Sequence, residues 1–319
     1  MLTVLVGLSG ALIFGAADFL GGMASRKISS VRVTAIAAAV GLVLLLAAHP
    51  LFGGEWSPEA LLFGGLSGVT GAGAIVLLYA CLAIGPMSIL SPLTAVVSAI
   101  VPMTVGLIRG ERLELLGYTA LGLALVAVVL VGFVPEQDAV RSSAKAIAMA
   151  TGSGVLIGAF LILIDLAPAD SGLTPLIANR AVNATIMFTV IAIISLVALG
   201  RRSAVTVPAA TAAAAAPATI ERPAPVEGPE SMVAQTHSPH PWLAGLKLAI
   251  FCGILDAVAN GLLLLGLRLG ELTVISVLTA MYSASTIILA ALFLRERMKP
   301  LQIFGLALAL ASAAMLAVV

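Results

Sequence analysis

Long apolar runs separated by short polar breaks extend along the chain from end to end. Most runs are 18 to 25 residues long, and about 20 helical residues cross about 30 Å of hydrocarbon. In lipid every backbone amide must be paired, so runs of this length are helices, whereas a barrel shows alternating segments of about ten residues. The pattern predicts an all-α integral membrane protein with ten transmembrane helices, near residues 2–24, 31–52, 60–84, 87–108, 115–134, 146–166, 174–199, 243–268, 272–294 and 300–318.

Composition agrees with the membrane assignment. Hydrophobic residues make up 61% of the 319 residues, charged residues 10%, and the mean hydropathy is +1.17. A soluble domain carries about 25% charged residues, so this chain has too little polar surface to face water on all sides. The net charge of +1 gives no field that would attract nucleic acid.

One connection differs from the others in length and composition. Residues 203–241 are rich in Ala and Pro and hold almost no large apolar side chain. Such a segment cannot bury enough surface to offset its ordering entropy, so we predict a disordered linker.

The chain also repeats itself. Residues 78–134 superpose without a gap on residues 263–319 at a constant offset of 185 positions, which places Glu111-Arg112 on Glu296-Arg297 and Ser91 on Ser276. The period is five spans, and an odd number of spans inverts the second copy, as in many secondary transporters. We therefore predict two inverted five-helix repeats, residues 1–134 and 146–319, joined by a connector at 135–145, with the linker 203–241 interrupting the second.

Several of these segments resemble a known family. The chain is similar to the EamA-type transporters of the drug/metabolite transporter superfamily, through "IFGAADFLGGMASRK", "LLYACLAIGPMSILSPL" and the paired "IRGERLELLG" and "FLRERMKPLQIFG". The resemblance implies a ten-helix bundle of two inverted repeats that moves a small molecule through a central cavity. It also implies that the first four helices of each repeat line this cavity. The helix that opens the second repeat, "GSGVLIGAFLILIDLA", lacks the Gly-Ala-Ala-Asp-Phe pattern of the first.

Two carboxylates lie inside predicted spans. A charge at the centre of a membrane helix costs about 2.5–3.5 kcal/mol, so it survives only facing a bundle interior or a wet cavity. Asp18 lies past the middle of the first span, where it can line a cavity or be solvated by headgroup water. Asp256 falls near the centre of the eighth span with Asn260 one turn on, which makes it the stronger candidate for proton binding.

Further polar residues complete the candidate site. Arg180 in the seventh span can meet an anionic substrate group, Asp256 or Asp165, or it can snorkel to the interface. Asn179 and Asn183 share a face of the same span and are further candidates for binding substrate. Tyr79 and Tyr282 can line a cavity, or they can serve as packing or interface anchors. Glu111 and Glu296 follow tight turns, where helix capping explains them better than transport.

These features predict a secondary active transporter, an exporter of a small metabolite or amphipathic drug. No Walker A loop, nucleophile elbow or His-Glu-x-x-His motif occurs, so we expect no catalytic residues, cofactor or metal site. The expected partners are a small-molecule substrate, the lipid bilayer and protons as candidate coupling ions, while a homodimer is left open. The rivals are a non-transporting membrane scaffold or sensor and, less favoured, a membrane-embedded enzyme.

Cation placement predicts the orientation in a plasma or inner membrane. Twelve of the sixteen Lys and Arg residues lie at odd-numbered loops, which the positive-inside rule places in the cytoplasm. A topology reporter inserted into the linker 203–241 should therefore read cytoplasmic, and one at the C-terminus extracytoplasmic. The reverse labelling would invert the orientation without changing the fold.

Overall fold

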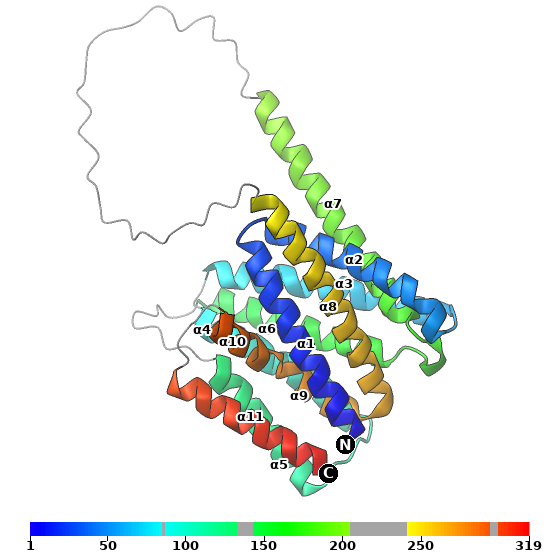
Figure 1. The fold of residues 1–319 in the computed structure, drawn as a ribbon, viewed down its shortest axis with the longest axis vertical. Coiled ribbons are helices and arrows are strands. Elements are labelled where there is room, and N and C mark those ends of the chain that lie inside the picture. Colours follow the sequence, from blue (N-terminus) through cyan, green and yellow to red (C-terminus); the bar gives the residue numbers. More distant parts are fainter. Residues whose placement is uncertain (85–86, 133–142, 205–240, 294–298, 319) are drawn as a thin grey trace, which may run out of the picture.

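A computed structural model of the chain describes residues 1–84, 87–132, 143–204, 241–293 and 299–318 (Figure 1). The described part of the chain is helical throughout, apart from short turns. The helices of the first half are α1 (Leu2–Ser25), α2 (Ser30–Phe52), α3 (Pro58–Ile84), α4 (Met87–Ile108) and α5 (Leu115–Gly132). Those of the second half are α6 (Ala144–Asp165), the short 3₁₀ helix η1 (Ala169–Ser171), α7 (Thr174–Ala204), α8 (Pro241–Leu269), α9 (Leu272–Ala280), α10 (Tyr282–Phe293) and α11 (Pro300–Val318).

The helices lie where the hydropathy pattern places them, and the differences are local. The structure has two helices, α9 and α10, where one span over 272–294 is predicted. The break is at Met281, whose N–H is shared between the carbonyls of Leu278 and Thr279. The backbone therefore makes one turn there that is tighter than an α-helical turn. The predicted disordered linker lies almost wholly outside the described residues.

Within the described residues, seven segments are long and apolar enough to cross a membrane, and α9 with α10 counts as one of them. Three shorter apolar helical segments fall in α4, α5 and α11. The chain is therefore an all-helical protein with several membrane spans, and the exact count of ten crossings stays a prediction.

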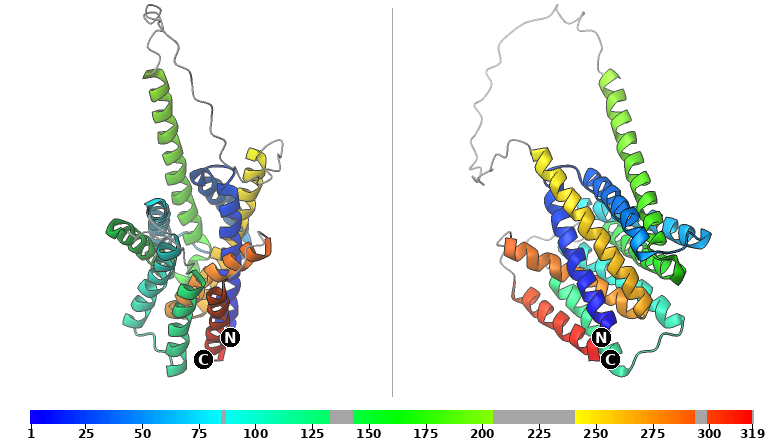
Figure 2. Two further views of the ribbon diagram at one scale, coloured as in Figure 1. Left: turned by 90° about the vertical axis from the view of Figure 1, so that its left-hand side faces the viewer. Right: turned by 45° about the vertical axis from the view of Figure 1, so that its right-hand side comes forward.

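Helix packing follows a two-fold pattern between the halves. Figure 2 shows one of the contacts, that of α1 (blue) with α8 (yellow to orange). We match α1 to α3 with α6 to α8, α4 with α9 and α10, and α5 with α11. The larger contacts between the halves then have counterparts in which the two halves have changed places. The packing of α1 on α8 then corresponds to that of α6 on α3, and α4 on α6 corresponds to α9 and α10 on α1. The pairs α2 with α7 and α5 with α11 map onto themselves. This pattern agrees with two repeats of one fold, and their inversion stays a prediction.

Small residues let α3 and α7 approach closely. A Cβ atom at Gly64 would collide with the Pro175 carbonyl, and one at Gly68 would lie 2.6 Å from the Asn179 carbonyl. Backbones can come this near only where side chains are absent, which is the usual role of small residues four apart in membrane helices.

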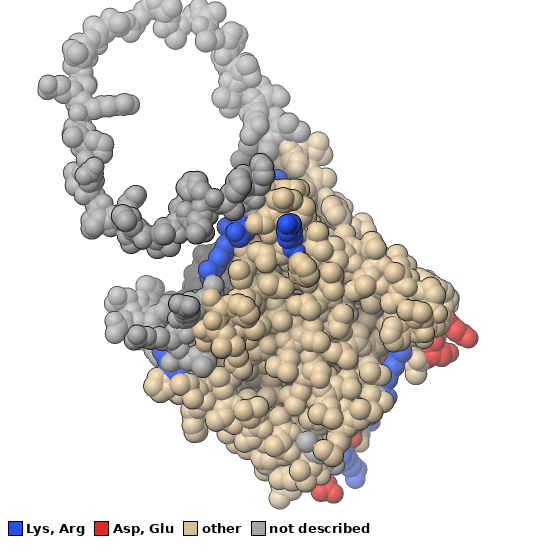
Figure 3. Space-filling view, in the orientation of Figure 1, with Lys and Arg blue, Asp and Glu red and all other residues tan. Residues whose placement is uncertain are grey.

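The two ends of the bundle differ in charge (Figure 3). We call the end where α1 stops and α8 begins the linker end, and the end that carries both chain termini in Figure 1 the termini end. The described charged residues near the linker end are cations, namely Arg26, Lys27, Arg32, Lys145, Lys247 and Lys299. The termini end carries mostly carboxylates, namely Glu55, Glu59, Glu111, Glu114, Asp165, Asp170 and Glu271, together with Arg109, Arg112 and Arg268.

The close α3–α7 contact gives a first test. Gly64→Ala should destabilise the protein by about 1–3 kcal/mol, because the added methyl overpacks a buried contact. Gly122→Ala on α5 is the matched control, since a Cβ there meets nothing within 4 Å and Ala favours a helix by up to about 1 kcal/mol. The midpoint of thermal denaturation in detergent measures both. Equal midpoints would contradict the close packing.

Candidate substrate site

An ion pair joins α7 to α8 in the middle of the bundle. Arg180 Nη2 lies 2.5 Å from Asp256 Oδ2, and the two side chains are only 11% and 23% exposed. Asn260 Nδ2 donates to the other carboxylate oxygen, Asp256 Oδ1, at 3.1 Å. Both oxygens of Asp256 are therefore held by protein donors, and its charge is balanced by Arg180.

Close packing of α8 on α2 supports this pair. Gly253 lies one turn before Asp256, and a Cβ atom there would come within 2.8 Å of the Ala37 backbone. Ala257, directly after Asp256, is buried. Small residues on both sides of the carboxylate thus bring α8 against α2, with the Arg180 side chain passing beside Gly41.

Asp18 has a different environment from Asp256. Its side chain is exposed, although it lies about 120–140° around α1 from the exposed Leu5 and Leu12. It shares a face with Ala11, two turns earlier, which is buried. Among the described residues, nothing donates a hydrogen bond or forms an ion pair to Asp18. This carboxylate therefore has accessible surface and lies on the side of α1 that turns away from Leu5 and Leu12.

The break between α9 and α10 places Tyr282 close to Asp18. The two groups interact electrostatically, and Asp18 also interacts with Asp256. Here α10 lies tightly against α1, because Ser285 Oγ donates to the Leu12 carbonyl at 2.9 Å. A Cβ atom at Gly15 would lie 2.6 Å from the Tyr282 carbonyl. The first turn of α10 is thus fixed against the helix that carries Asp18.

The predicted site residues divide into two groups. Asp18, Arg180, Asp256, Asn260 and Tyr282 form one electrostatically linked cluster.

The two asparagines of α7 lie apart from this cluster. Asn179 is buried and donates to Ser67 Oγ on α3 at 2.8 Å. Asn183 is also buried and lies near Gly71 of α3, and its Oδ1 has no hydrogen-bond partner among the described residues. Tyr79 lies on α3, but its side chain is outside the described residues. Asp165, the other predicted partner of Arg180, pairs instead with Arg109 at 2.6 Å.

One further residue belongs to the cluster. Cys252 is partly buried and interacts electrostatically with Asp256, Asp18 and Arg180. Its position one turn before Asp256, on the same face of the helix, was the available signal.

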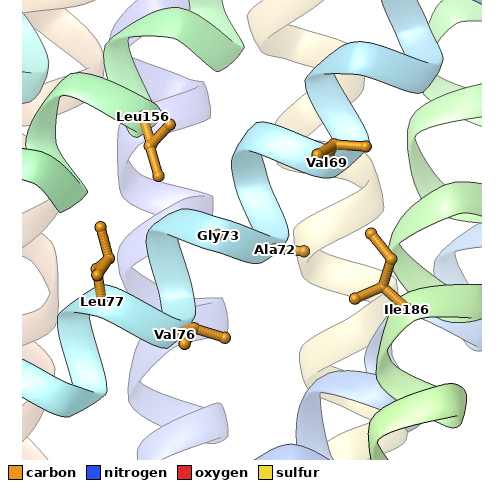
Figure 4. A pocket seen from close by; sticks show the side chains of 7 residues that line it. All are labelled: Val69, Ala72, Gly73, Val76, Leu77, Leu156 and Ile186. Atoms are coloured by element: carbon orange, nitrogen blue, oxygen red, sulfur yellow. The ribbon is translucent and has the colours of Figure 1, made fainter.

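The described part also has an apolar groove that does not suit a polar substrate. An apolar groove of about 470 Å³ lies between α3, α6 and α7 (Figure 4). It contains no charged or polar side chain, so nothing there could orient a polar substrate; its lining residues are Val69, Ala72, Gly73, Val76, Leu77, Leu156 and Ile186. No group of three His, Cys, Asp or Glu among the described residues could hold a metal ion.

Comparison with known proteins agrees with this arrangement. The model of the EamA-like transporter family matches residues 1–133 and again residues 184–318. The chain belongs to the EamA-like transporter family. Its two matches correspond to two repeats, so this family member is a multi-pass membrane transporter built from two EamA units. The second match begins inside α7, and so leaves out α6, whose sequence lacks the Gly-Ala-Ala-Asp-Phe pattern of α1.

A solved structure shares the fold of this EamA-like chain. That structure, described only as "Crystal structure of protein", has a TM-score of 0.65 and 14% sequence identity. The similarity covers 98% of this chain and 95% of the other. The comparison with curated proteins gave no match.

The ion pair in this EamA-like protein can be tested by a double-mutant cycle. Removing one partner of a buried pair leaves an uncompensated charge and costs about 3–5 kcal/mol. Arg180→Ala should therefore lower the denaturation midpoint more than the double variant Arg180→Ala/Asp256→Asn, which removes both charges. Arg180→Lys keeps the charge and is the matched control, with a smaller loss expected. Additive effects of the two single changes would show that the pair is not coupled.

Proposed function

We propose that this protein is a secondary active transporter that exports a small metabolite or amphipathic drug by alternating access, coupled to protons. One observation carries the proposal: an accessible, unpaired carboxylate, Asp18, lies beside a neutralised ion pair in the interior of an EamA-like bundle. An intramembrane ionisable group of this kind is costly to keep, which favours a functional role.

Charge supports a cationic ligand at this position. Arg180 balances Asp256, so Asp18 leaves the cluster with one negative charge when it is ionised. Only a proton or a cationic group of a substrate can neutralise that charge without rearranging the pair. Asp18 is therefore the group that accepts the proton or the cation, while Asp256 and Asn260 hold Arg180 in place. Helix position alone favours Asp256 over Asp18 as the proton-binding carboxylate, and this assignment reverses that order.

The second tyrosine of the candidate site is part of the same proposal. Tyr282 begins α10 directly after the break at Met281, and a broken membrane helix near the substrate site is a recurrent feature of secondary transporters. Its ring and hydroxyl, beside Asp18, provide an apolar face and a hydrogen-bonding group for an amphipathic molecule. Movement of α10 relative to α9 then couples occupancy of Asp18 to the rocking of the two repeats.

The energy source follows from the sequence. The chain has no Walker A loop, so we infer that an ion gradient drives transport. A proton that binds Asp18 on one side and is released on the other exchanges with a cationic substrate for the same carboxylate. Export then uses the inward proton gradient directly.

A substrate search precedes the mechanistic test. Purified protein is screened for thermal stabilisation across a metabolite and drug library, and the best ligand is then followed in proteoliposomes with an imposed pH gradient. Gradient-dependent flux supports the transporter. Ligand binding without flux at any gradient would favour the alternative, a membrane scaffold or sensor.

Asp18→Asn should abolish proton-linked flux and make residual substrate movement independent of pH, because the amide has the same shape but does not titrate. Asp256→Asn should weaken transport mainly by releasing Arg180, and the pH profile should keep its form. Flux of the selected ligand against pH measures both variants, and Glu114→Gln, exposed and distant in sequence from the cluster, is the control. A normal pH profile in Asp18→Asn would refute the assignment of Asp18.

A further inference from the structure

At the termini end, a carboxylate of one half caps a helix of the other half. Glu111 lies in the connection between α4 and α5. Its Oε1 accepts a hydrogen bond from the backbone N–H of Leu272 at 2.9 Å, and its Oε2 accepts one from Thr273 at 2.9 Å. These two N–H groups begin α9, where a helix has no internal acceptors and carries a partial positive charge.

The surrounding packing is shaped to this contact. A Cβ atom at Gly106, near the end of α4 and five residues before Glu111, would collide with Glu111 Oε2. Thr273 Oγ1 donates in turn to the Met103 carbonyl at 3.3 Å. Three hydrogen bonds therefore join the end of α4 and the connection after it to the start of α9. They surround Gly106, where a larger residue would displace the Glu111 carboxylate.

Other polar contacts cross between the halves at the same end. Arg109 pairs with Asp165 at 2.6 Å, and Thr3 Oγ1 donates to the Leu269 carbonyl at 3.1 Å. The Glu55 amide donates to the Asp170 carbonyl at 3.1 Å. The connections of both halves are thus joined to each other by several polar contacts at the termini end.

A second carboxylate opposes the Glu111 cap. Glu271 directly precedes α9, and its Oε2 is buried without a partner among the described residues. Burial, followed by the negative charge of Glu111, raises the pKa of Glu271. Glu271 therefore disfavours the arrangement that Glu111 stabilises, because one of its oxygens is buried without a partner among the described residues and its charge is repelled by that of Glu111.

We propose that Glu111 is a latch that holds the termini end of the transporter closed, and that Glu271 sets how easily the latch opens. The proposal rests on the alternating-access function, because a latch between halves has a role only if the halves separate. The start of α9 leaves Glu111 when this end opens, and its two N–H groups then face water. Two changes at Glu111 should shift the balance towards the open state. Glu111→Asp shortens the side chain and keeps its charge, and Glu111→Gln removes the charge.

The test measures access and not transport, so it can fail independently of the proposed function. Ser276→Cys is the reporter, because Ser276 lies one turn into α9 and is buried. It is placed in a Cys81→Ala/Cys252→Ala background and reconstituted in nanodiscs, where both faces are accessible. The rate of modification by a charged maleimide reports opening. Ala249→Cys, fully buried near the linker end on α8, reports general loosening.

Glu111→Gln should raise the labelling rate at Ser276→Cys by about tenfold or more, since hydrogen bonds to a charged acceptor are among the stronger ones in proteins. The rate at Ala249→Cys should not rise. Glu111→Asp should give a smaller increase, and Glu271→Gln should lower the rate below that of the parent. Glu114→Gln, exposed on the same connection, should leave both reporters unchanged.

Unchanged labelling at Ser276→Cys in Glu111→Gln would overturn the latch, as would an equal rise at both reporters, which indicates general destabilisation. If Glu111→Gln does not yield monodisperse protein, Glu111→Asp and Glu271→Gln decide. Opposite shifts in these two variants support the latch, and shifts of the same sign, or none, refute it.

Discussion

The absence of water in the bilayer core is the constraint on which this structure depends. Without water, backbone amides must be paired within helices, and a charged side chain needs a partner or an accessible space. Asp256 has a charged partner in Arg180, and Asn260 donates a hydrogen bond to its other carboxylate oxygen. Asp18 has no protein donor among the described residues, but its side chain is accessible. The two carboxylates therefore have different surroundings despite similar chemistry.

Small residues make this distribution of charge possible. Gly253 brings α8 against α2 beside Asp256, and Gly15 brings α10 against α1 beside Asp18. At the termini end, Gly106 likewise has no side chain and leaves room for Glu111 to cap α9. In each case a missing side chain lets two helices from different halves approach, and a polar contact lies directly next to that approach. Packing and electrostatics are thus joined at the same positions.

Much of the fold could be predicted from hydropathy, because membrane helices must be long, apolar and continuous. The break at Met281 could not, since it depends on how α10 packs against α1 and leaves the apolar pattern intact. For the site, residue type and depth indicated Asp18, Arg180 and Asp256. Depth alone ranks Asp256 first, whereas the proposed assignment ranks Asp18 first, because the pairing of Asp256 with Arg180 depends on the rotation of α7 and α8, which sequence spacing does not set. The same uncertainty in rotation explains why Asn179 and Asn183 turn towards α3.

The central claim is that Asp18 is the titrating carboxylate and that Asp256 stays ionised in its pair. Infrared difference spectroscopy of purified protein in lipid, recorded between acid and neutral pH, resolves protonation of individual carboxyl groups when paired with Asn variants. The account predicts that the band of the protonated carboxylic acid disappears in Asp18→Asn and persists in Asp256→Asn. Loss of that band in Asp256→Asn, with an unchanged band in Asp18→Asn, would contradict it.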